Sequence, residues 1–375
     1  MRVAYLVHDL NDPAVARRLR MLRIGGMDAV VAGFWRGAPP PSEIAGAPAI
    51  ALGQTFDARF AHRSLATLRQ VLAPQALARR LGPVHVLMAR NLEMLAVARA
   101  LRRARGGNLP IAYEVLDIHR LLLSPGRAGR ILRAVERGLM READLLVTSS
   151  PAFQREYFEA RQFSKHALPV ALVENKLLFL NAAEQAESDP LDGPPWRIGW
   201  FGMIRCRRSF DILSRLARKR PDLVRIEIHG RPAAGVFGDL AREVAQVPAM
   251  TFGGAYAPAD LGRLYRNVHF VWAIDYFEEG GNSEWLLPNR LYEGGSFNAV
   301  PLALRRTETG RWLDRLGLGV LMDDPARELE SFLETVSPHA YLRMRDAARR
   351  APRSAFVADR SDCERLVSIL ADRAA

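Results

Sequence analysis

The sequence predicts an α/β protein made of two doubly wound, Rossmann-like domains. Short apolar runs of strand length alternate with segments of helical periodicity along most of the chain, which is typical of parallel sheets covered by helices. The length of 375 residues exceeds what one hydrophobic core usually holds. Residues 181–195 carry four acids and three prolines without periodicity, which indicates an interdomain linker. We therefore expect an N-terminal domain over 1–180, a C-terminal domain over 196–355 and a C-terminal helix over 356–375.

The first series of strands begins at once, with an apolar run over residues 2–7. Asp12 and Pro13 then provide a helix N-cap and first position, and Gly25-Gly26 ends that helix. The turn lacks the G-x-G-x-x-G pattern of dinucleotide-binding folds, which disfavours NAD and FAD. Residues 34–53 are rich in Pro and Gly and are expected to be a loop. The later strands are expected at 29–32, 84–88, 111–115, 145–148 and 170–173.

The second series follows the linker and has the same pattern. A loop over residues 201–209 connects its first strand to a helix over 210–219. Because the carboxyl ends of parallel strands meet at one edge of a sheet, the polar clusters that follow the strands should lie at a common edge in each domain. The strands of this series are expected at 197–200, 224–229, 250–252, 270–274, 299–303 and 319–322.

The charge of the chain is unusual. Its 53 basic and 41 acidic residues give a net charge of +12, which implies an anionic partner such as a phospholipid surface, a diphosphate or nucleic acid. Residues 56–81 interleave arginines with apolar residues. This segment is either a basic amphipathic helix at an anionic membrane interface or a core helix with a solvated basic face, and Pro74 interrupts its pattern.

The location of the protein follows from what the sequence lacks. Two cysteines are too few for a disulfide framework and have no metal-type spacing, which favours a reducing cytoplasm. His8 and Asp9 interrupt the first apolar run too early for a signal peptide. No apolar run approaches the ~20 residues of a membrane span. Any attachment to the inner face of the membrane should therefore be peripheral.

The most informative stretch spans residues 270–303. A buried strand leads through an acidic, Gly-rich loop into a helix opened by Pro288. Asn289 and Arg290 lie in the first turn of this helix, where free N–H groups favour an anion. Glu293 follows one turn later, where a carboxylate can accept both hydroxyls of a ribose.

The sequence of this stretch, PNRLYEGG (288–295) followed by VPLA (300–303), resembles the nucleotide-sugar site of GT-B glycosyltransferases. That resemblance implies two Rossmann-like domains facing a central cleft, with a nucleotide diphosphate-sugar as co-substrate and no bound cofactor or metal. It also places the base of the nucleotide near Tyr256 and the sugar near Asn282 or Ser283. Family members often separate two glutamates by seven residues, whereas Glu284 and Glu293 have eight between them. The stereochemical outcome therefore stays open.

Two further groups of candidate residues come from the sheet edges. Around the first loop of the second domain, Gly202 allows close backbone approach, and Arg205, with Arg208 as second choice, would neutralise the leaving diphosphate.

In the first domain, a hydroxyl of the acceptor would enter near His8, Arg90, Asn91 and Glu93. Asp117, His119 and Asp9 are the candidate catalytic residues, because proton abstraction needs a carboxylate or an imidazole. The alternative role of Asp117 is to cap the following turn, and the alternative for Glu114 is a satisfied carboxylate in the core.

Four segments look like bacterial transferases of exopolysaccharide assembly, including the succinoglycan type. They are VAYLVHDLNDPAVARRLRML, RNLEMLAVA, YEVLDIHRLL and NSEWLLPNRLYEGG. This resemblance implies a hexosyltransferase that uses a nucleotide sugar, with UDP as the expected nucleotide, and a polyprenyl-diphosphate-linked oligosaccharide as acceptor. A sugar-nucleotide 2-epimerase on the same fold is the alternative enzyme. A nucleic-acid-binding protein is the alternative from another class, but no nucleic-acid-binding motif supports it.

Overall fold

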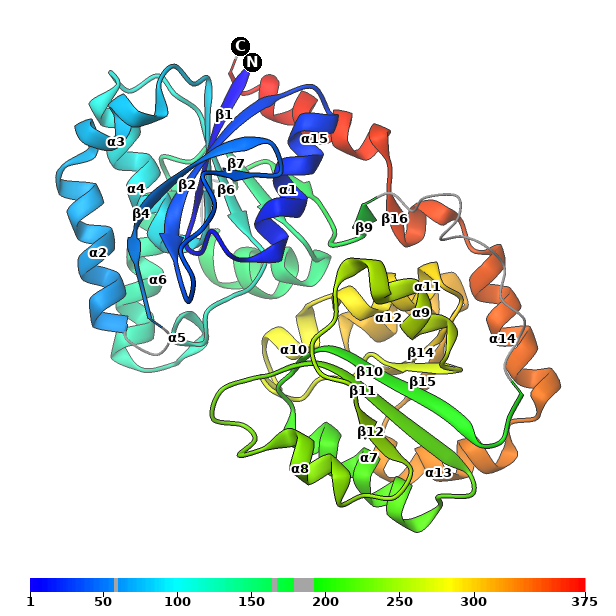
Figure 1. Cartoon of the computed structure of the whole chain (residues 1–375). Coiled ribbons are helices and arrows are strands. Elements are labelled where there is room, and N and C mark those ends of the chain that lie inside the picture. The colour runs from blue at the N-terminus through cyan, green and yellow to red at the C-terminus, as the bar shows by residue number, and fades with distance from the viewer. Residues whose placement is uncertain (57–59, 164–166, 179–191, 375) are drawn as a thin grey trace. The chain divides into compact units, whose positions relative to one another are not determined.

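The computed structural model describes residues 1–56, 60–163, 167–178 and 192–374. It divides into two compact units, one formed by Met1–Glu174 with Ala358–Ala375 and the other by Asn175–Val357. Most of the expected linker, 181–195, lies outside the described residues. The C-terminal helix α15 (Arg360–Ala371) belongs to the first unit, although it follows the second unit in sequence (Figure 1). Within the described ranges, no helix is both long and apolar enough to cross a bilayer.

An eight-stranded sheet forms the centre of the first unit, in the order β3-β4-β2-β1-β5-β6-β7-β8. Its strands are parallel except β3, which pairs antiparallel with β4. The chain adds strands on one side of β1 and then, from β5, on the other, so the order reverses between β1 and β5. The strands are β1 (Arg2–Val7), β2 (Asp28–Trp35), β3 (Glu43–Ile44), β4 (Ala47–Gln54), β5 (Val86–Arg90), β6 (Ile111–Val115), β7 (Leu145–Thr148) and β8 (Val170–Leu172).

Helices cover both faces of this sheet. In Figure 1, α2, α3, α4 and α6 lie on one face, and α1 and α15 lie on the other. The side chain of Asp12 accepts a hydrogen bond from the backbone N–H of Ala14, which confirms the predicted cap of α1. The helices are α1 (Pro13–Ile24), α2 (Phe60–Leu72), α3 (Pro74–Leu81), α4 (Asn91–Ala104), α5 (Arg120–Leu123), α6 (Arg127–Met140) and the π-helix η1 (Phe153–Gln162).

Two sequence predictions about this unit were wrong. The expected loop over 34–53 contains the end of β2, the short strand β3 and all of β4. The Ala- and Pro-rich β4 has little intrinsic strand preference, and its pairing with β2 holds it extended. The helix expected over 56–81 is instead two helices, since Pro74 cannot donate a backbone hydrogen bond within a helix and opens α3.

The second unit contains a six-stranded parallel sheet in the order β12-β11-β10-β13-β14-β15. Numbered within the unit this order is 3-2-1-4-5-6, the doubly wound arrangement of dinucleotide-binding folds, and it reverses between β10 and β13. Two parallel sheets confirm the predicted α/β class. The strands are β10 (Trp196–Ile204), β11 (Val224–Pro232), β12 (Met250–Phe252), β13 (Phe270–Trp272), β14 (Val300–Leu304) and β15 (Val320–Met322), while β9 (Leu177–Leu178) and β16 (Val357–Ala358) form a separate pair.

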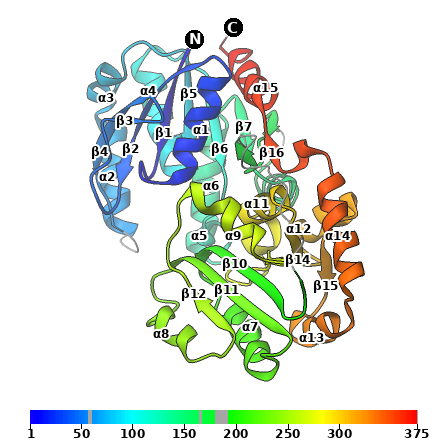
Figure 2. The same cartoon turned by 45° about the vertical axis from the view of Figure 1, so that its right-hand side comes forward.

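The helices of this unit form two layers. Helices α7 (Arg207–Lys219), α8 (Leu240–Ala245) and α13 (Pro325–Thr335) cover one face of the sheet, as Figure 2 shows, with α14 (Pro338–Arg350) packed on the same core. Helices α9 (Leu261–Arg266), α11 (Asn289–Ser296) and α12 (Glu308–Leu316) cover the other. The short helix α10 (Asn282–Trp285) lies in the loop expected between β13 and α11.

Candidate functional site

The reversal of strand order between β10 and β13 positions the first candidate site. Open α/β sheets bind ligands outside the carboxyl ends of the strands at such a point. Gly202 lies near the end of β10 with a φ of +104°, and Arg205 follows this strand. Asp275 follows β13, and Arg290 lies in the first turn of α11. Segments about 70 residues apart in sequence therefore meet at one sheet edge.

A carboxylate between two arginines is the centre of this site. Asp275, 3% exposed, accepts hydrogen bonds at Oδ2 from Arg205 Nε (3.0 Å) and Nη2 (2.7 Å). Burial acts to raise the pKa of Asp275, but the charges of Arg205 and Arg290 outweigh it, and the pKa is lowered. The Arg205 guanidinium also lies 5.3 Å from the ring centre of Phe277. The arrangement holds Arg205 in one orientation at the sheet edge.

Arg290 is an under-coordinated buried cation. It is 9% exposed, and within the described part of the chain its two terminal nitrogens donate only long hydrogen bonds, to the carbonyls of Phe201 (3.5 Å) and Ile274 (3.4 Å). Its Nε has no hydrogen-bond partner among the described residues. Burial lowers the pKa of Arg290, against the stabilising charge of Asp275. A guanidinium held this way has donors to offer an anionic ligand.

The predicted ribose-binding carboxylate lies in the same neighbourhood. Tyr265 Oη donates to Glu293 Oε2 over 2.7 Å, which orients the carboxylate. Burial and the nearby charge of Glu293 raise the pKa of Tyr256, while Arg290 acts in the opposite direction. A Cβ on Gly202 would lie 3.9 Å from Tyr256 Oη. Gly202, Tyr256, Arg290 and Glu293 therefore surround one region at the edge of the sheet.

Other residues predicted for the donor site have different surroundings. Asn282 and Ser283 are buried, and both are hydrogen-bonded to Glu278. Asn282 Nδ2 donates to the Glu278 carboxylate (2.5 Å), and the backbone N–H of Glu278 donates to Ser283 Oγ (2.9 Å). These hydrogen bonds brace the loop between β13 and α11, and a contact of Asn282 or Ser283 with the sugar stays a prediction. Asn289 is exposed at the start of α11. Arg208 forms an ion pair with Glu279, with 2.9 Å between Nη1 and Oε2. Its guanidinium carbon lies 4.1 Å from the ring centre of Tyr276, and it does not bind Asp275.

The sequence reasoning did not assign Asp275 or Tyr265 to the site. Asp275 had a usable signal, because a carboxylate directly after a buried strand lies at the sheet edge. Tyr265 had none, since its partner Glu293 is 28 residues away. Glu284, the other glutamate of this stretch, pairs with Arg306 at 3.4 Å.

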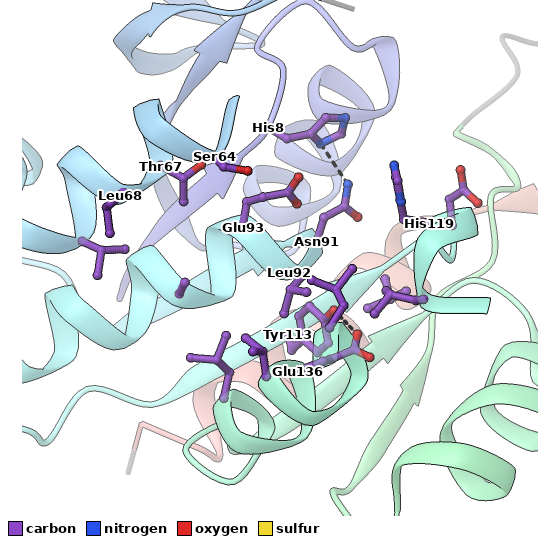
Figure 3. A pocket seen from close by; sticks show the side chains of 18 of the residues that line it. His8, Ser64, Thr67, Leu68, Asn91, Leu92, Glu93, Tyr113, His119 and Glu136 are labelled. Atoms are coloured by element: carbon purple, nitrogen blue, oxygen red, sulfur yellow. Dashed lines mark hydrogen bonds between the residues drawn. The ribbon is translucent and has the colours of Figure 1, made fainter. Parts of the chain in front are cut away.

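A second candidate site lies in the first unit, at the reversal between β1 and β5. His8 directly follows β1 and Asn91 directly follows β5, and His8 Nδ1 lies 3.2 Å from Asn91 Nδ2 (Figure 3). Asn91 has a positive φ of +69°, an uncommon conformation for a residue other than glycine. Burial, with the charge of Arg90, lowers the pKa of His8 to about 4, so the imidazole is neutral at pH 7.

These two residues open onto a pocket of about 430 Å³. Its polar end combines the predicted residues His8, Asn91, Glu93, Asp117 and His119, which follow β1, β5 and β6 in sequence. Figure 3 shows His8, Asn91, Glu93 and His119 at this end. Nδ1 of His119 accepts from the backbone N–H of Leu121 (3.3 Å) and so caps α5. Residues expected on the acceptor side from separate segments therefore share one cavity.

Arg90 and Asp9 do not line this pocket. Arg90 is 2% exposed and donates to Glu114 (2.8 Å), Asp12 (3.0 Å) and the carbonyl of Ala14 (3.3 Å). Arg18 binds the other oxygen of Glu114 at 2.6 Å. Arg90 is therefore a structural residue rather than an acceptor-side one, because its charge is used inside the core. The Asp9 carboxylate accepts from the backbone of Asn11 and lies 3.9 Å from Arg36.

Glu136 is a pocket residue that the sequence reasoning missed. It is fully buried on α6 and accepts hydrogen bonds from Tyr113 Oη (2.7 Å), Tyr157 Oη and Gln162 Nε2. Burial raises its pKa, against the effect of these hydrogen bonds. Figure 3 shows Tyr113 and Glu136 directed toward each other beside the pocket. Nothing in the sequence of an arginine-rich helix distinguishes this carboxylate from an exposed one.

Comparisons with known proteins agree with this description. The chain is 46% identical over 385 residues to the succinoglycan biosynthesis protein ExoL of Rhizobium meliloti (strain 1021), a match that covers 99% of this chain and 93% of that protein. No family model matches the chain.

Solved structures share the fold at low sequence identity. Anabaena Alr3699/HepE in complex with UDP-glucose has a TM-score of 0.70 at 14% identity, covering 99% of each chain. Sucrose-phosphate synthase from Thermosynechococcus elongatus has a TM-score of 0.72 at 15% identity, covering 100% of this chain and 98% of that one. The chain therefore belongs to the family of the succinoglycan biosynthesis protein ExoL and has the GT-B glycosyltransferase fold.

Proposed function

We propose that the protein is a metal-independent glycosyltransferase of exopolysaccharide assembly that transfers a hexose from a UDP-sugar to a polyprenyl-diphosphate-linked oligosaccharide. The observation that carries this proposal is the buried, under-coordinated Arg290 beside the Arg205–Asp275 pair, with Glu293 in the same region of the sheet edge. The family relationship and the exopolysaccharide named for the Rhizobium protein support the product class. The Anabaena structure with UDP-glucose supports the donor class.

The donor half of the reaction belongs to the second unit. In the transfer, the bond between the anomeric carbon and the diphosphate oxygen breaks, and the leaving UDP carries the electron pair. Arg205 and Arg290 would stabilise the charge that develops on this diphosphate. The backbone N–H groups at the start of α7, which begins at Arg207, would add a further anion-binding element. Glu293, held by Tyr265, would bind the ribose hydroxyls.

The acceptor half belongs to the pocket of the first unit. Asp117 is the residue that we propose to take the proton from the attacking hydroxyl, which would invert the anomeric centre. His8 is neutral at pH 7 and, with Asn91 donating to its Nδ1, carries its proton on Nε2, where it would donate to an acceptor oxygen. Retention would need no protein base, so the anomer of the product tests the role of Asp117.

The decisive experiment is thermal stabilisation of the protein by a panel of nucleotide sugars, repeated with Glu293→Ala. We expect one UDP-sugar to raise the melting temperature of the parent, and the variant to lose this shift. If no nucleotide sugar stabilises the parent, the assignment of the donor site is wrong. Release of an epimerised free sugar nucleotide without any acceptor would instead identify a 2-epimerase.

A further inference from the structure

The apolar part of the pocket in the first unit extends away from its polar end. Helix α4 forms the floor of this region through Leu92 and Ala96. The walls are α2, through Leu68 and Val71, and α6, through Leu132 and Val135. Figure 3 shows these helices around the pocket, with His8, Asn91 and His119 at one end. We call this apolar region the α2–α6 trough.

The helices that form the walls also expose large hydrophobic side chains to solvent. Leu72 is 74% exposed, Ile131 65% and Leu65 51%, and the wall residues Leu68 and Val135 are each 48% exposed. Single exposed leucines are common on soluble proteins, but several on two helices that border one apolar trough form a patch. Such a patch indicates a surface that is covered in use.

The two segments that form the walls of the trough carry surface charges of one sign. Residues 60–81, which include α2 and α3, contain no acid, and residues 120–141, which include α5 and α6, contain only Glu136. Glu136 is fully buried and bound by Tyr113, Tyr157 and Gln162, so it does not face the surroundings. Arginines in these two segments are Arg63, Arg69, Arg79, Arg80, Arg120, Arg127, Arg130, Arg133, Arg137 and Arg141.

We propose that this face docks onto an anionic lipid bilayer, with α2 and α6 in the headgroup region and a lipid chain in the α2–α6 trough. The proposal rests on the lipid-linked acceptor of the proposed function and identifies the surface that meets the lipid. Exposed Leu and Ile between arginines match the apolar and anionic layers of such a surface. Because the trough is continuous with the polar end of the pocket, a lipid entering it would lead to His8 and Asp117.

Two other occupants are disfavoured, the first by charge and the second by the kind of side chain exposed. A second copy presenting the same face would bring arginines against arginines, which disfavours association. A nucleic-acid strand would be expected to stack on exposed aromatic rings, whereas the large side chains described as exposed on α2 and α6 are aliphatic. An anionic bilayer is complementary both to the arginines and to the exposed aliphatic side chains of this face.

The test is co-sedimentation of the full chain with vesicles of phosphatidylglycerol and phosphatidylcholine, compared with pure phosphatidylcholine. We expect binding to the anionic vesicles that falls as salt rises. Leu72→Ser with Ile131→Ser, and separately Arg69→Gln with Arg130→Gln, should weaken this binding about tenfold or more. The matched controls are Leu172→Ser with Leu316→Ser, which are 48% and 38% exposed, and Arg263→Gln with Arg327→Gln, which are 62% and 88% exposed.

Three results would overturn the proposal. They are absence of binding to anionic vesicles, equal binding to neutral vesicles, and equal weakening by the variants and their controls. If light scattering shows a parent dimer that Leu72→Ser with Ile131→Ser converts to monomer without any vesicle binding, the face covers a second copy instead. Stabilisation by UDP-sugar, measured on every variant, tests the donor site separately, so a failure of lipid docking is distinguishable from a failure of the proposed function.

Discussion

Arg205 and Asp275 follow β10 and β13, which are adjacent in the sheet of the second unit, and a single carboxylate oxygen of Asp275 accepts from two nitrogens of Arg205. The same carboxylate lies within the electrostatic reach of the buried Arg290. Asp275 therefore reduces the repulsion between two guanidinium groups that we assign to one diphosphate.

Asp275→Asn should destabilise the protein by about 2–4 kcal/mol at pH 7, because it leaves Arg290 buried without a counter-charge. The pKa of Asp275 is lowered in the folded state, so its contribution is present above the unfolded value near 4 and is lost as pH falls below it. The difference in melting temperature between parent and variant should consequently narrow between pH 7 and pH 3.5. An equal difference at both pH values would contradict this account.

Arg205→Gln should weaken binding of the UDP-sugar by tenfold or more, since a charge-assisted contact with the diphosphate is lost. The neighbouring Arg207 provides a matched control, because its guanidinium binds Glu243 and packs on Phe237. Calorimetric titration of Arg207→Gln should give the affinity of the parent. Similar losses of affinity in both variants would show that binding depends on the loop as a whole and not on Arg205 in particular.

Glu293→Gln should also reduce affinity for the UDP-sugar by about tenfold or more, because a neutral amide binds the ribose hydroxyls less strongly than a carboxylate. Glu284→Gln tests the other glutamate of the stretch. Glu284 is engaged by Arg306 on the surface, so its removal should change affinity by less than about twofold. If Glu284→Gln reduced the affinity more than Glu293→Gln in the same titration, the ribose-binding role would belong to Glu284 instead.

His8 predicts a specific dependence of stability on pH. Its pKa is lowered to about 4 in the folded state, so between about pH 6.5 and 4 the unfolded chain binds a proton that the folded chain does not. Stability should therefore fall through this window as pH falls, by up to about 3 kcal/mol. In His8→Gln, the melting temperature should depend less on pH over this range than it does in the parent protein. His339→Gln, which removes an exposed imidazole from the other unit, should leave the slope unchanged.

Glu136→Ala should destabilise the protein by about 3 kcal/mol or more, since Tyr113, Tyr157 and Gln162 would lose their common acceptor inside the core. The control on the same segment is Glu142→Ala. Glu142 is 31% exposed and binds Arg99 and Arg103, so its loss should cost under about 1 kcal/mol. Denaturant unfolding gives the free energy of unfolding of both variants. Equal losses of stability would contradict the role of Glu136 as a shared acceptor in the core.

Local patterns were sufficient for most of the secondary structure. Apolar runs predicted the strands β6, β7 and β12 with the bounds that the structure has, and Asp12 was predicted as a cap. The signal failed at β4, because its Ala and Pro residues become a strand only through pairing with β2. The pocket shows the same division: polar residues after β1, β5 and β6 were predicted from the common edge of a parallel sheet, whereas Glu136 was not.

The sequence by itself determined the two α/β series, the family resemblance and the stretch that contains Glu293, because caps, periodicity and motif spacing are properties of neighbouring residues. Only the tertiary structure decided which charges are available to a ligand. Arg90 was expected on the acceptor side and is used by Glu114, 24 residues away, while Glu114 also binds Arg18, 96 residues away. Ion pairs between distant segments depend on burial and strand order, which no local pattern encodes.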